Sequence, residues 1–400
     1  MRFVLHPGNR GATMTTQTTT AENWRDSQFS DRFADIRAVL REEYGEAHRY
    51  PWIVAFSGGK DSTLVAHLVF EMLMALPPSR RTRPVHFIAN DTLVESPLVV
   101  EHMTNGIREI SHAAAAFDLP VDTCITRPET DQSFWVNLIG RGYPSPNQSF
   151  RWCTDRMKIQ PTSRYVKEQI SAEGRAILLL GVRRSESAAR SASVARHDSN
   201  GRLNPHGDMP GCMVFRPIVE LSTDDVWEFL SCHAPPWGGS HQKLIKLYRD
   251  AGGGECPVVT QKSDVPSCGT RSSRFGCWTC TVVEKDRSLA GFVDSGFDEF
   301  GPLLSFRDWL VSIRNEPHRR QARRRNGKIT MARDGGLIPG PYTLQTRAEI
   351  LQRLESVQAE TGKDLISEEE TEIIRQIWAD DIIRQSRPQS VGIHQVNGGK

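Results

Sequence analysis

The feature that most constrains the fold is a short polar loop that joins an apolar run to a segment of helical periodicity. The loop directly follows the apolar residues 52–56 and contains two adjacent glycines and a lysine. Adjacent glycines let the backbone approach an anion closely, and the amino terminus of the following helix favours negative charge. This order predicts a phosphate-binding turn. Its residues are Ser57, Gly58, Gly59, Lys60, Asp61, Ser62 and Thr63.

Short apolar runs alternate with segments of helical periodicity as far as residue 230. This alternation predicts an α/β fold, in which a parallel sheet is flanked by helices and the ligand lies at the carboxyl ends of the strands. The expected strands are residues 52–56, 85–89, 121–125 and 176–181, and the expected helices are residues 30–48, 63–76, 99–117, 159–173 and 222–230.

The chain has 400 residues, which is too long for one compact core. We expect a disordered N-terminus (1–25), an α/β domain that contains the phosphate-binding turn (26–233) and a Cys-rich segment (234–302). A helical region (303–387) and a flexible tail (388–400) are expected to follow. No apolar run approaches the ~20 residues that cross a bilayer, and the N-terminus lacks an apolar signal core. The sequence therefore predicts a cytoplasmic protein with no membrane partner.

The loop is not a Walker A motif, because its glycines are adjacent and stand directly before the lysine. The order S-G-G-K-D-S resembles the PP-loop of ATP pyrophosphatases, which grip the pyrophosphate of ATP and transfer AMP to an oxygen atom. Further segments resemble those of phosphoadenylylsulfate reductases and their relatives, in the same order. They are residues 90–97, 151–158 (R-x-C-x-x-x-x-K), 181–190 (G-x-R-x-x-E-S-x-x-R) and 216–227 (P-I and D-V-W).

This resemblance implies ATP and Mg²⁺ as cofactors. Lys60 and Asp61 are expected to act in catalysis, with Asp61 holding magnesium through water. Adenine is expected near residues 89–91. The residues expected to complete the nucleotide site are Asp91, Lys158, Arg183 and Arg190.

Cys153 stands in a loop before an expected helix, with Arg151, Arg156 and Lys158 near it in sequence. Positive charge close to a thiol lowers its pKa and favours the thiolate. We therefore interpret Cys153 as a catalytic nucleophile or sulfur carrier beside the ATP site. A core thiol and a cluster ligand are the alternatives.

Four cysteines fall within one Gly- and Pro-rich segment: Cys256, Cys268, Cys277 and Cys280. In a cytoplasmic chain such a group favours a metal site over disulfides. Four thiolates suit either a [4Fe–4S] cluster or zinc, and the spacing does not separate the two.

Residues 254–283 resemble the cluster region of DndC-type DNA sulfur-modification proteins, with the SspD-type proteins as the nearest siblings. The resemblance covers about residues 30–385 and implies a [4Fe–4S] cluster. It also implies three kinds of partner: DNA, a cysteine desulfurase as sulfur donor, and the other proteins of a DNA sulfur-modification complex.

Eight basic residues lie between Arg314 and Arg333, although the formal net charge of the chain is only +2. A run of this kind is typical of a solvated helix face. Closely spaced arginines also suit contacts with a DNA backbone, so both interpretations stay open.

The main hypothesis is that the chain adenylates a DNA backbone phosphate and replaces a non-bridging oxygen by sulfur, held on Cys153 or on the cluster. A reductase of adenylylated sulfate is one alternative, although the expected C-terminal nucleophile is missing, since the last cysteine is Cys280. A tRNA-thiolating enzyme is another, and a nucleotide-gated DNA-binding scaffold is the non-enzymatic one.

Overall fold

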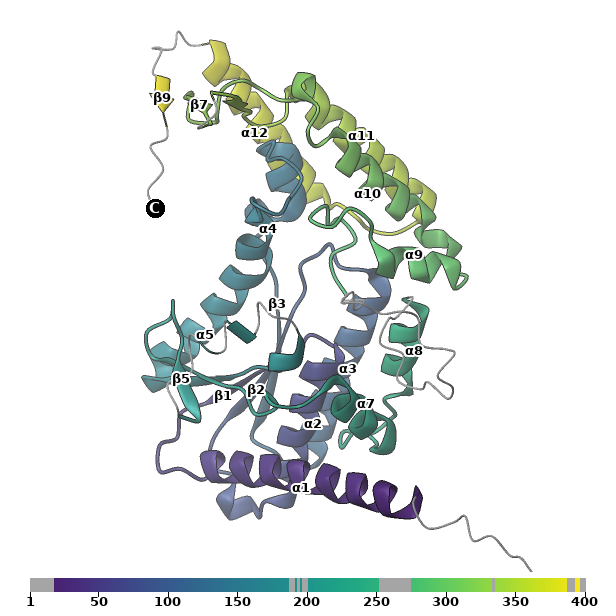
Figure 1. The fold of residues 1–400 in the computed structure, drawn as a ribbon. Coiled ribbons are helices and arrows are strands. Elements are labelled where there is room, and N and C mark those ends of the chain that lie inside the picture. Colours follow the sequence, from purple (N-terminus) through teal and green to yellow (C-terminus); the bar gives the residue numbers. More distant parts are fainter. Residues whose placement is uncertain are drawn as a thin grey trace, which may run out of the picture.

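The structure is a computed structural model that describes residues 18–186, 191–192, 195, 201–251, 275–332, 335–386 and 393–395. Figure 1 shows a sheet with its covering helices at one end of the molecule and a group of C-terminal helices at the other. No helix in these ranges is both long and apolar enough to cross a membrane.

The central sheet has six strands in the order β3-β2-β1-β4-β6-β5. Every neighbouring pair is parallel except β5–β6, which is antiparallel. The α/β prediction is confirmed. The strands are β1 Trp52–Ala55, β2 Val85–Asn90, β3 Val121–Thr126, β4 Ala176–Leu179, β5 Leu203–Pro205 and β6 Cys212–Phe215.

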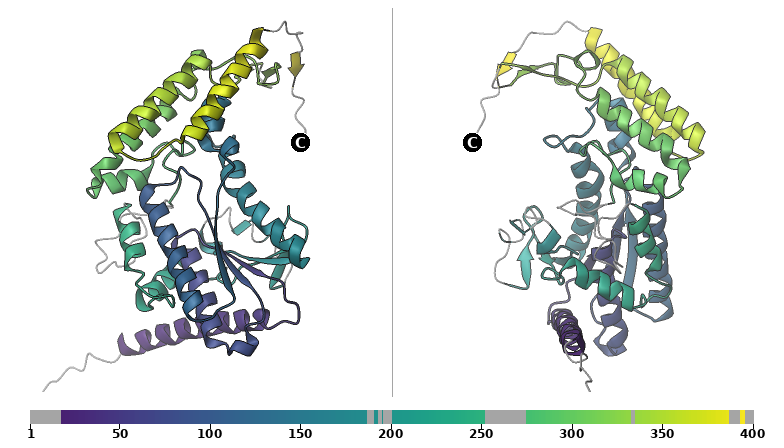
Figure 2. Two further views of the ribbon diagram at one scale, coloured as in Figure 1. Left: turned by 180° about the vertical axis from the view of Figure 1, so that it is seen from behind. Right: turned by 45° about the vertical axis from the view of Figure 1, so that its right-hand side comes forward.

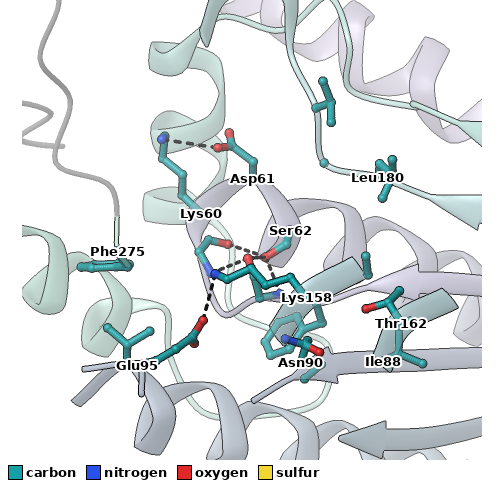
Figure 3. Close-up of a pocket in the computed structure, with 18 of the residues that line it drawn as sticks. Lys60, Asp61, Ser62, Ile88, Asn90, Glu95, Lys158, Thr162, Leu180 and Phe275 are labelled. Atoms are coloured by element: carbon teal, nitrogen blue, oxygen red, sulfur yellow. Dashed lines mark hydrogen bonds and ion pairs between the residues drawn. The ribbon is translucent and has the colours of Figure 1, made fainter. Parts of the chain in front are cut away.

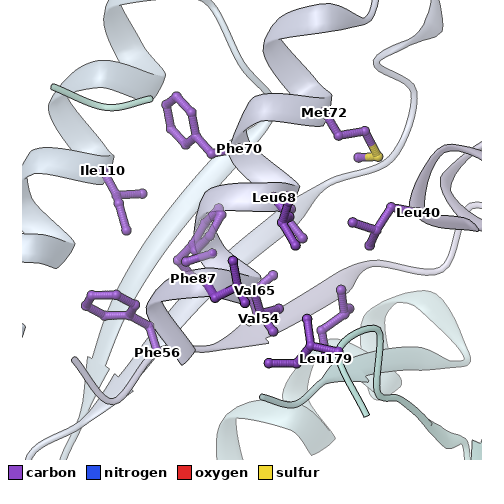
Figure 4. Packing of buried hydrophobic residues seen from close by; sticks show 14 of the residues in the cluster. Leu40, Val54, Phe56, Val65, Leu68, Phe70, Met72, Phe87, Ile110 and Leu179 are labelled. Carbon is purple, nitrogen blue, oxygen red and sulfur yellow. The ribbon is translucent and has the colours of Figure 1, made fainter. Parts of the chain in front are cut away.

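Successive residues of the central strands are buried against different helices, because side chains alternate between the two faces of a sheet. Val54 belongs to the larger core, shown in Figure 4 with Leu68 and Phe87. Ile53 faces the smaller core, which contains Val166. The larger core is covered by α1 Thr18–Tyr44, α2 Lys60–Ala75, α3 Pro97–Ala116, α7 Thr223–Cys232 and α8 Gln242–Asp250, and the smaller one by α5 Gln160–Glu173.

A second hydrophobic cluster organises the C-terminal helices, which lie side by side in both views of Figure 2. Trp135, Trp278 and Phe306 pack together within it, with ring centroids about 6 Å apart. The helices are α9 Arg287–Asp294, α10 Gly301–Ile313, α11 Leu344–Thr361 and α12 Glu368–Ser386.

Short elements complete the description. A small sheet of order β8-β7-β9 contains β7 Ile329–Met331, β8 Leu337–Ile338 and β9 Ile393–Gln395. The short helical turns are Pro78–Arg80, Thr130–Gln132, Val136–Gly140, α4 Trp152–Thr154, Asp155–Ile159, Arg184–Glu186, Asp298–Phe300 and Pro317–Arg319.

The structure differs from the sequence prediction at three places. Residues 18–25 are helical, whereas disorder is predicted over residues 1–25. Residues 393–395 pair with β7 in the predicted flexible tail, because backbone pairing needs no apolar pattern. The strands β5 and β6 were not predicted; β5 has only three residues.

Candidate active site

The predicted phosphate-binding turn forms as expected between β1 and α2. Gly58 has a φ of +72°, a conformation that side chains with a Cβ rarely adopt. Gly59 is the N-cap of α2, and Lys60 is the first helical residue. The Ser57 amide donates to Ser62 Oγ over 3.1 Å, and Ser62 Oγ donates to the Gly59 carbonyl over 2.9 Å. These bonds hold the turn in a shape that aims the helix amino terminus into a pocket.

That pocket, here called the loop pocket, has a volume of about 360 Å³ (Figure 3). It opens at the carboxyl ends of β1, β2 and β4, where a parallel sheet of this kind binds its ligand. Ile88, Ala89 and Asn90 form one wall beside the turn. The adenine position expected from the sequence therefore lies on the surface of the loop pocket.

A further glycine lets the end of β4 come close to the turn. A Cβ on Gly181 would lie 2.8 Å from the backbone carbonyl of Asp61, which is closer than real Cβ atoms approach. Any side chain at this position would push the turn away from the sheet. Gly181 thus fixes the depth of the loop pocket.

Arg183 lies behind the turn and not on the surface of the loop pocket. It is fully buried, and its Nε donates to Asp61 Oδ1 over 2.6 Å. It also donates to the hydroxyls of Ser185 and Thr223 over 2.8 and 3.1 Å. Arg183 therefore orients Asp61. It does not line the loop pocket, so this geometry does not place it in the direct contact with a nucleotide that the sequence had led us to expect.

Asp61 is paired with two cations. Its Oδ1 accepts from Arg183, and its Oδ2 lies 3.4 Å from Lys60 Nζ, as Figure 3 shows for the Lys60 pair. A carboxylate that already neutralises two cations is a weak ligand for Mg²⁺, so these contacts do not support the magnesium role expected of Asp61. We derive no step through that ion.

Asp91 fixes a turn after β2. Its Oδ1 accepts the Leu93 amide over 2.9 Å, and its Oδ2 lies 3.1 Å from Arg127 Nε. Leu93 adopts a φ of 64° as a result of this turn. Asp91 is buried and does not line the loop pocket, in contrast to the expectation from sequence. Arg190, the other basic residue expected there, lies outside the described residues.

A larger cavity, here called the thiol pocket, adjoins the loop pocket. Its volume is about 960 Å³, and three cysteines line it: Cys153, Cys277 and Cys280. Lys158 and Phe275 line both pockets and separate them. The structure thus brings the predicted sulfur carrier and the C-x-x-C pair together, next to the predicted phosphate site.

The pKa of Cys153 is raised, because the thiol is buried and Cys280 lies nearby. The prediction that nearby basic residues lower this pKa is wrong. The Arg151 guanidinium turns to the side chain of Gln148, and that of Arg156 turns to Gln132 and Tyr143. Closeness in sequence does not place these charges at the sulfur.

Burial also raises the pKa of Cys277, to about 12, against the opposing effects of Lys158 and of a hydrogen bond with Thr92. Lys158 donates to Glu95 Oε1 over 3.0 Å across the boundary between the pockets (Figure 3). Burial lowers the pKa of Lys158, but Cys277 and Glu95 outweigh this effect and raise it. Lys158 therefore carries positive charge at the place where the two pockets meet.

Only two of the four cysteines predicted to bind a metal cluster, Cys277 and Cys280, belong to the residues that the structure describes. Two of the four expected ligands, Cys256 and Cys268, lie outside them. Among the described residues, no three His, Cys, Asp or Glu side chains are placed to hold one metal ion. Cys277 and Cys280 are separated by a turn in which the Cys280 amide donates to the Cys277 carbonyl over 3.0 Å.

Arg307 of α10 and Arg314 at its C-cap hold the backbone behind the wall of the thiol pocket. The fully buried Arg307 donates to the carbonyls of Cys280 and Glu284 over 2.9 and 2.7 Å, and to that of Val283. Arg314 donates to the carbonyls of Thr281 and Pro146 over 2.5 and 3.2 Å. The segment after Cys280 is thus held to α10 by side chains far away in sequence.

The basic run between Arg314 and Arg333 is not a helix face, because it follows α10 and passes through a short turn and β7. Arg319 pairs with Glu316 and Glu349, and Arg320 donates to the Gly340 carbonyl. Arg325 pairs with Asp381 over 3.0 Å. Several of these guanidinium groups are therefore committed to contacts within the protein, which leaves fewer of them for a DNA backbone.

A family model supports the placement of this site. The model of the phosphoadenosine phosphosulfate reductase domain matches residues 51–283, which include the loop pocket and the three cysteines of the thiol pocket. The chain belongs to this family. No curated protein sequence matches the chain.

Solved structures similar to this family member share little sequence with it. The phosphoadenylyl-sulfate reductase from Candida auris is 16% identical, with 56% of this chain and 91% of that chain covered and a TM-score of 0.32. The U34-tRNA thiolase NcsA from Methanococcus maripaludis, solved with its [4Fe–4S] cluster, is 13% identical, with 65% and 90% covered and a TM-score of 0.33. The NH3-dependent NAD synthetase from Campylobacter jejuni is 14% identical, with 50% and 71% covered and a TM-score of 0.31.

Two aromatic residues of the site, Tyr248 and Phe275, were not predicted as site residues from the sequence. Tyr248 of α8 lines the loop pocket, and its hydroxyl accepts the Lys60 amide over 3.3 Å. Phe275 packs against the Tyr248 ring, with centroids 4.4 Å apart. Both contacts of Tyr248 join segments that no local motif connects, so only the tertiary structure reveals them.

Proposed function

We propose that the protein is an ATP pyrophosphatase that adenylates a phosphate oxygen and then directs sulfur to the activated phosphorus. The observation that carries this proposal is the contact between the two pockets. A phosphate-binding turn of the family type shares a wall, formed by Lys158 and Phe275, with a cavity that holds three cysteines. An enzyme that only bound or hydrolysed a nucleotide would have no use for thiols at this wall.

In the first step, the amino terminus of α2 and Lys60 hold the β- and γ-phosphates of ATP, and Ile88 to Asn90 hold the adenine. An oxygen of the acceptor phosphate attacks the α-phosphorus. The new oxygen–phosphorus bond forms as the bond to pyrophosphate breaks. Lys60 stabilises the charge that develops on the leaving group.

In the second step, the terminal sulfur of a Cys153 persulfide attacks the adenylated phosphorus, and AMP leaves with the original oxygen. A second thiol of the thiol pocket then cleaves the sulfur–sulfur bond. This leaves a phosphorothioate and a protein disulfide, which a cellular dithiol must reduce before the next turnover. The three cysteines around one cavity supply enough thiols for this sequence.

The proposed acceptor is a DNA backbone phosphate, with a cysteine desulfurase as sulfur donor and other proteins of a DNA sulfur-modification complex as partners. This part of the proposal rests on the resemblance of residues 254–283 to DndC-type and SspD-type proteins. The internal contacts of Arg319, Arg320 and Arg325 do not add to it.

A second candidate is the reduction of adenylylated sulfate, which the family match favours. In that reaction the loop pocket would hold the sulfonucleotide, and Cys153 would attack its sulfur.

The test uses the purified full chain with two substrate sets. With Mg-ATP and DNA, we expect pyrophosphate release that falls strongly in Lys60→Ala. With adenylylated sulfate and a dithiol, we expect no sulfite. Sulfite formation without pyrophosphate release would replace the main proposal by the reductase. Retained DNA modification in Lys60→Ala would instead support a nucleotide-gated scaffold.

A further inference from the structure

The hydroxyl of Tyr248 lies at the mouth of the phosphate-binding turn. It accepts the backbone N–H of Lys60 over 3.3 Å, and a Cβ on Gly59 would lie 3.3 Å from the same oxygen. Lys60 is the first residue of α2, so its N–H belongs to the amides at a helix amino terminus that have no partner within the helix. These amides are the ones that bind phosphate oxygens.

One N–H points in one direction, so a phosphate oxygen that accepts from Lys60 must take the place of the Tyr248 hydroxyl. We infer that Tyr248 is a nucleotide-sensing residue: its hydroxyl competes with a phosphate oxygen for the Lys60 amide, and its displacement is passed on to the thiol pocket. This inference rests on the proposed binding of ATP in the loop pocket and adds a regulatory contact to it.

The path to the thiol pocket is a pair of aromatic rings. The Tyr248 ring meets Phe275 at a centroid distance of 4.4 Å and an angle of 62°. Phe275 lines both pockets and stands two residues before Cys277. The next backbone bond along the chain runs from the Trp278 amide to the Val94 carbonyl over 3.0 Å. A shift of Tyr248 therefore acts first on Phe275 and then on the backbone that carries Cys277.

Two further contacts hold the Tyr248 ring near the turn. Lys60 Nζ lies 5.4 Å from the centroid of the Tyr248 ring, within the range of a cation–π contact. The Trp227 ring lies nearly perpendicular to the Tyr248 ring, with centroids 4.9 Å apart. Tyr248→Phe should keep these ring contacts and remove only the competing oxygen, which makes it the informative substitution.

The experiment measures ATP-dependent pyrophosphate release by the wild-type full chain, by Tyr248→Phe and by Tyr165→Phe. Tyr165→Phe is the matched control, since it removes a phenolic hydroxyl that bonds to His86 Nδ1 over 3.0 Å, away from the turn. We expect the KM for ATP to fall about fivefold in Tyr248→Phe, the value of one neutral hydrogen bond, with little change in kcat. We expect no such fall in Tyr165→Phe.

Hydrogen–deuterium exchange of the peptide that contains residues 275–282 provides the second readout. In the wild type, ATP should speed exchange in this peptide, because Phe275 loses part of its support. In Tyr248→Phe, the ring contacts are kept, so exchange without ATP should match that of the wild type and should change less when ATP is added. An unchanged or raised KM in Tyr248→Phe, or an ATP effect on exchange equal to that of the wild type, would overturn the inference.

The same experiment separates this inference from the proposed function. If the wild type neither releases pyrophosphate nor shows any response to ATP in hydrogen–deuterium exchange, the proposed function fails and the Tyr248 variant is not needed to show it. If the wild type works and Tyr248→Phe behaves like the wild type, only the sensing role of Tyr248 fails.

Discussion

The loop pocket and the thiol pocket share a wall but are built in opposite ways. The anion-facing part of the loop pocket is a turn of seven consecutive residues, 57–63, whose backbone shape is fixed by Gly58 and by bonds within the turn. The thiol pocket is assembled from Cys153, the C-x-x-C pair and the start of α9, and Cys153 lies more than a hundred residues before Cys277. A contiguous motif carries its own geometry, whereas an assembled cavity depends on the contacts that bring its parts together.

The two pockets also differ in their electrostatics. In the loop pocket, Lys60 and the amino terminus of α2 favour an anion. In the thiol pocket, burial raises the pKa of Cys153 and Cys277 and keeps these thiols protonated. An environment that favours an anion is therefore preformed in the loop pocket, whereas the thiols must lose a proton before they can react.

The largest expected effect is the loss of pyrophosphate release when Lys60 of the loop pocket is replaced. Lys60→Ala should lower pyrophosphate release by about 10²–10³-fold, because a preorganised charge at the leaving group is lost. The thermal unfolding temperature should change little relative to wild type. Lys167→Ala, at an exposed position of α5, is the control. An equal loss of pyrophosphate release in Lys60→Ala and Lys167→Ala would show that Lys60 has no specific role in the reaction.

The next prediction distinguishes the roles of the two pockets by measuring sulfur incorporation and pyrophosphate release separately. Cys153→Ser should lower sulfur incorporation into DNA by about 100-fold or more, as loss of a nucleophile does, and should lower pyrophosphate release far less. Mass spectrometry of digested DNA measures the first quantity, and a coupled assay measures the second. Cys124→Ser, in β3, is the comparison variant. Full sulfur incorporation by Cys153→Ser would remove Cys153 as the carrier.

A smaller effect should appear when the assembly of the thiol pocket is weakened. Arg307→Met removes the donor of three backbone carbonyls and should lower the free energy of unfolding by about 3 kcal/mol. Chemical denaturation measures this loss, and Arg375→Met, exposed on α12, should show almost none. If Arg307→Met is as stable as wild type, the thiol pocket does not depend on α10.

The smallest effect concerns two buried histidines behind the turn. His67 Nδ1 lies 3.2 Å from His241 Nε2, and burial together with the neighbouring imidazoles lowers their pKa values to about 3 and about 4. The unfolded chain takes up protons below pH 6.5 while the folded chain does not. The free energy of unfolding should therefore fall as the pH drops from 6.5 toward 4, by roughly 1.4 kcal/mol per unit for each histidine at most.

Denaturation at pH 7.5 and pH 5.5 measures this loss. His67→Gln should be less stable than wild type at pH 7.5 but should lose less between the two pH values. His112→Gln, at an exposed position of α3, should keep the wild-type pH dependence. An identical pH dependence in His67→Gln would show that the buried pair does not control acid stability.

The sequence by itself determined the parts that depend on neighbouring residues. The apolar runs and their spacing predicted β1 to β4 and the helices between them, because strand and helix periodicity are local properties. The glycines and lysine at 58–60 predicted the turn for the same reason. The short motifs that resemble those of phosphoadenylylsulfate reductases also predicted the family to which the chain belongs.

Only the tertiary structure decided which charged and aromatic side chains face the site. Arg183 and Asp91 were expected at the nucleotide, but each is held by a partner far away in sequence. Arg151 and Arg156 were expected to lower the pKa of Cys153, but both turn to other side chains. Tyr248 reaches Lys60 across 188 positions of sequence. A long side chain can reach in several directions from one backbone position, so its contacts are fixed by packing and not by the residues beside it.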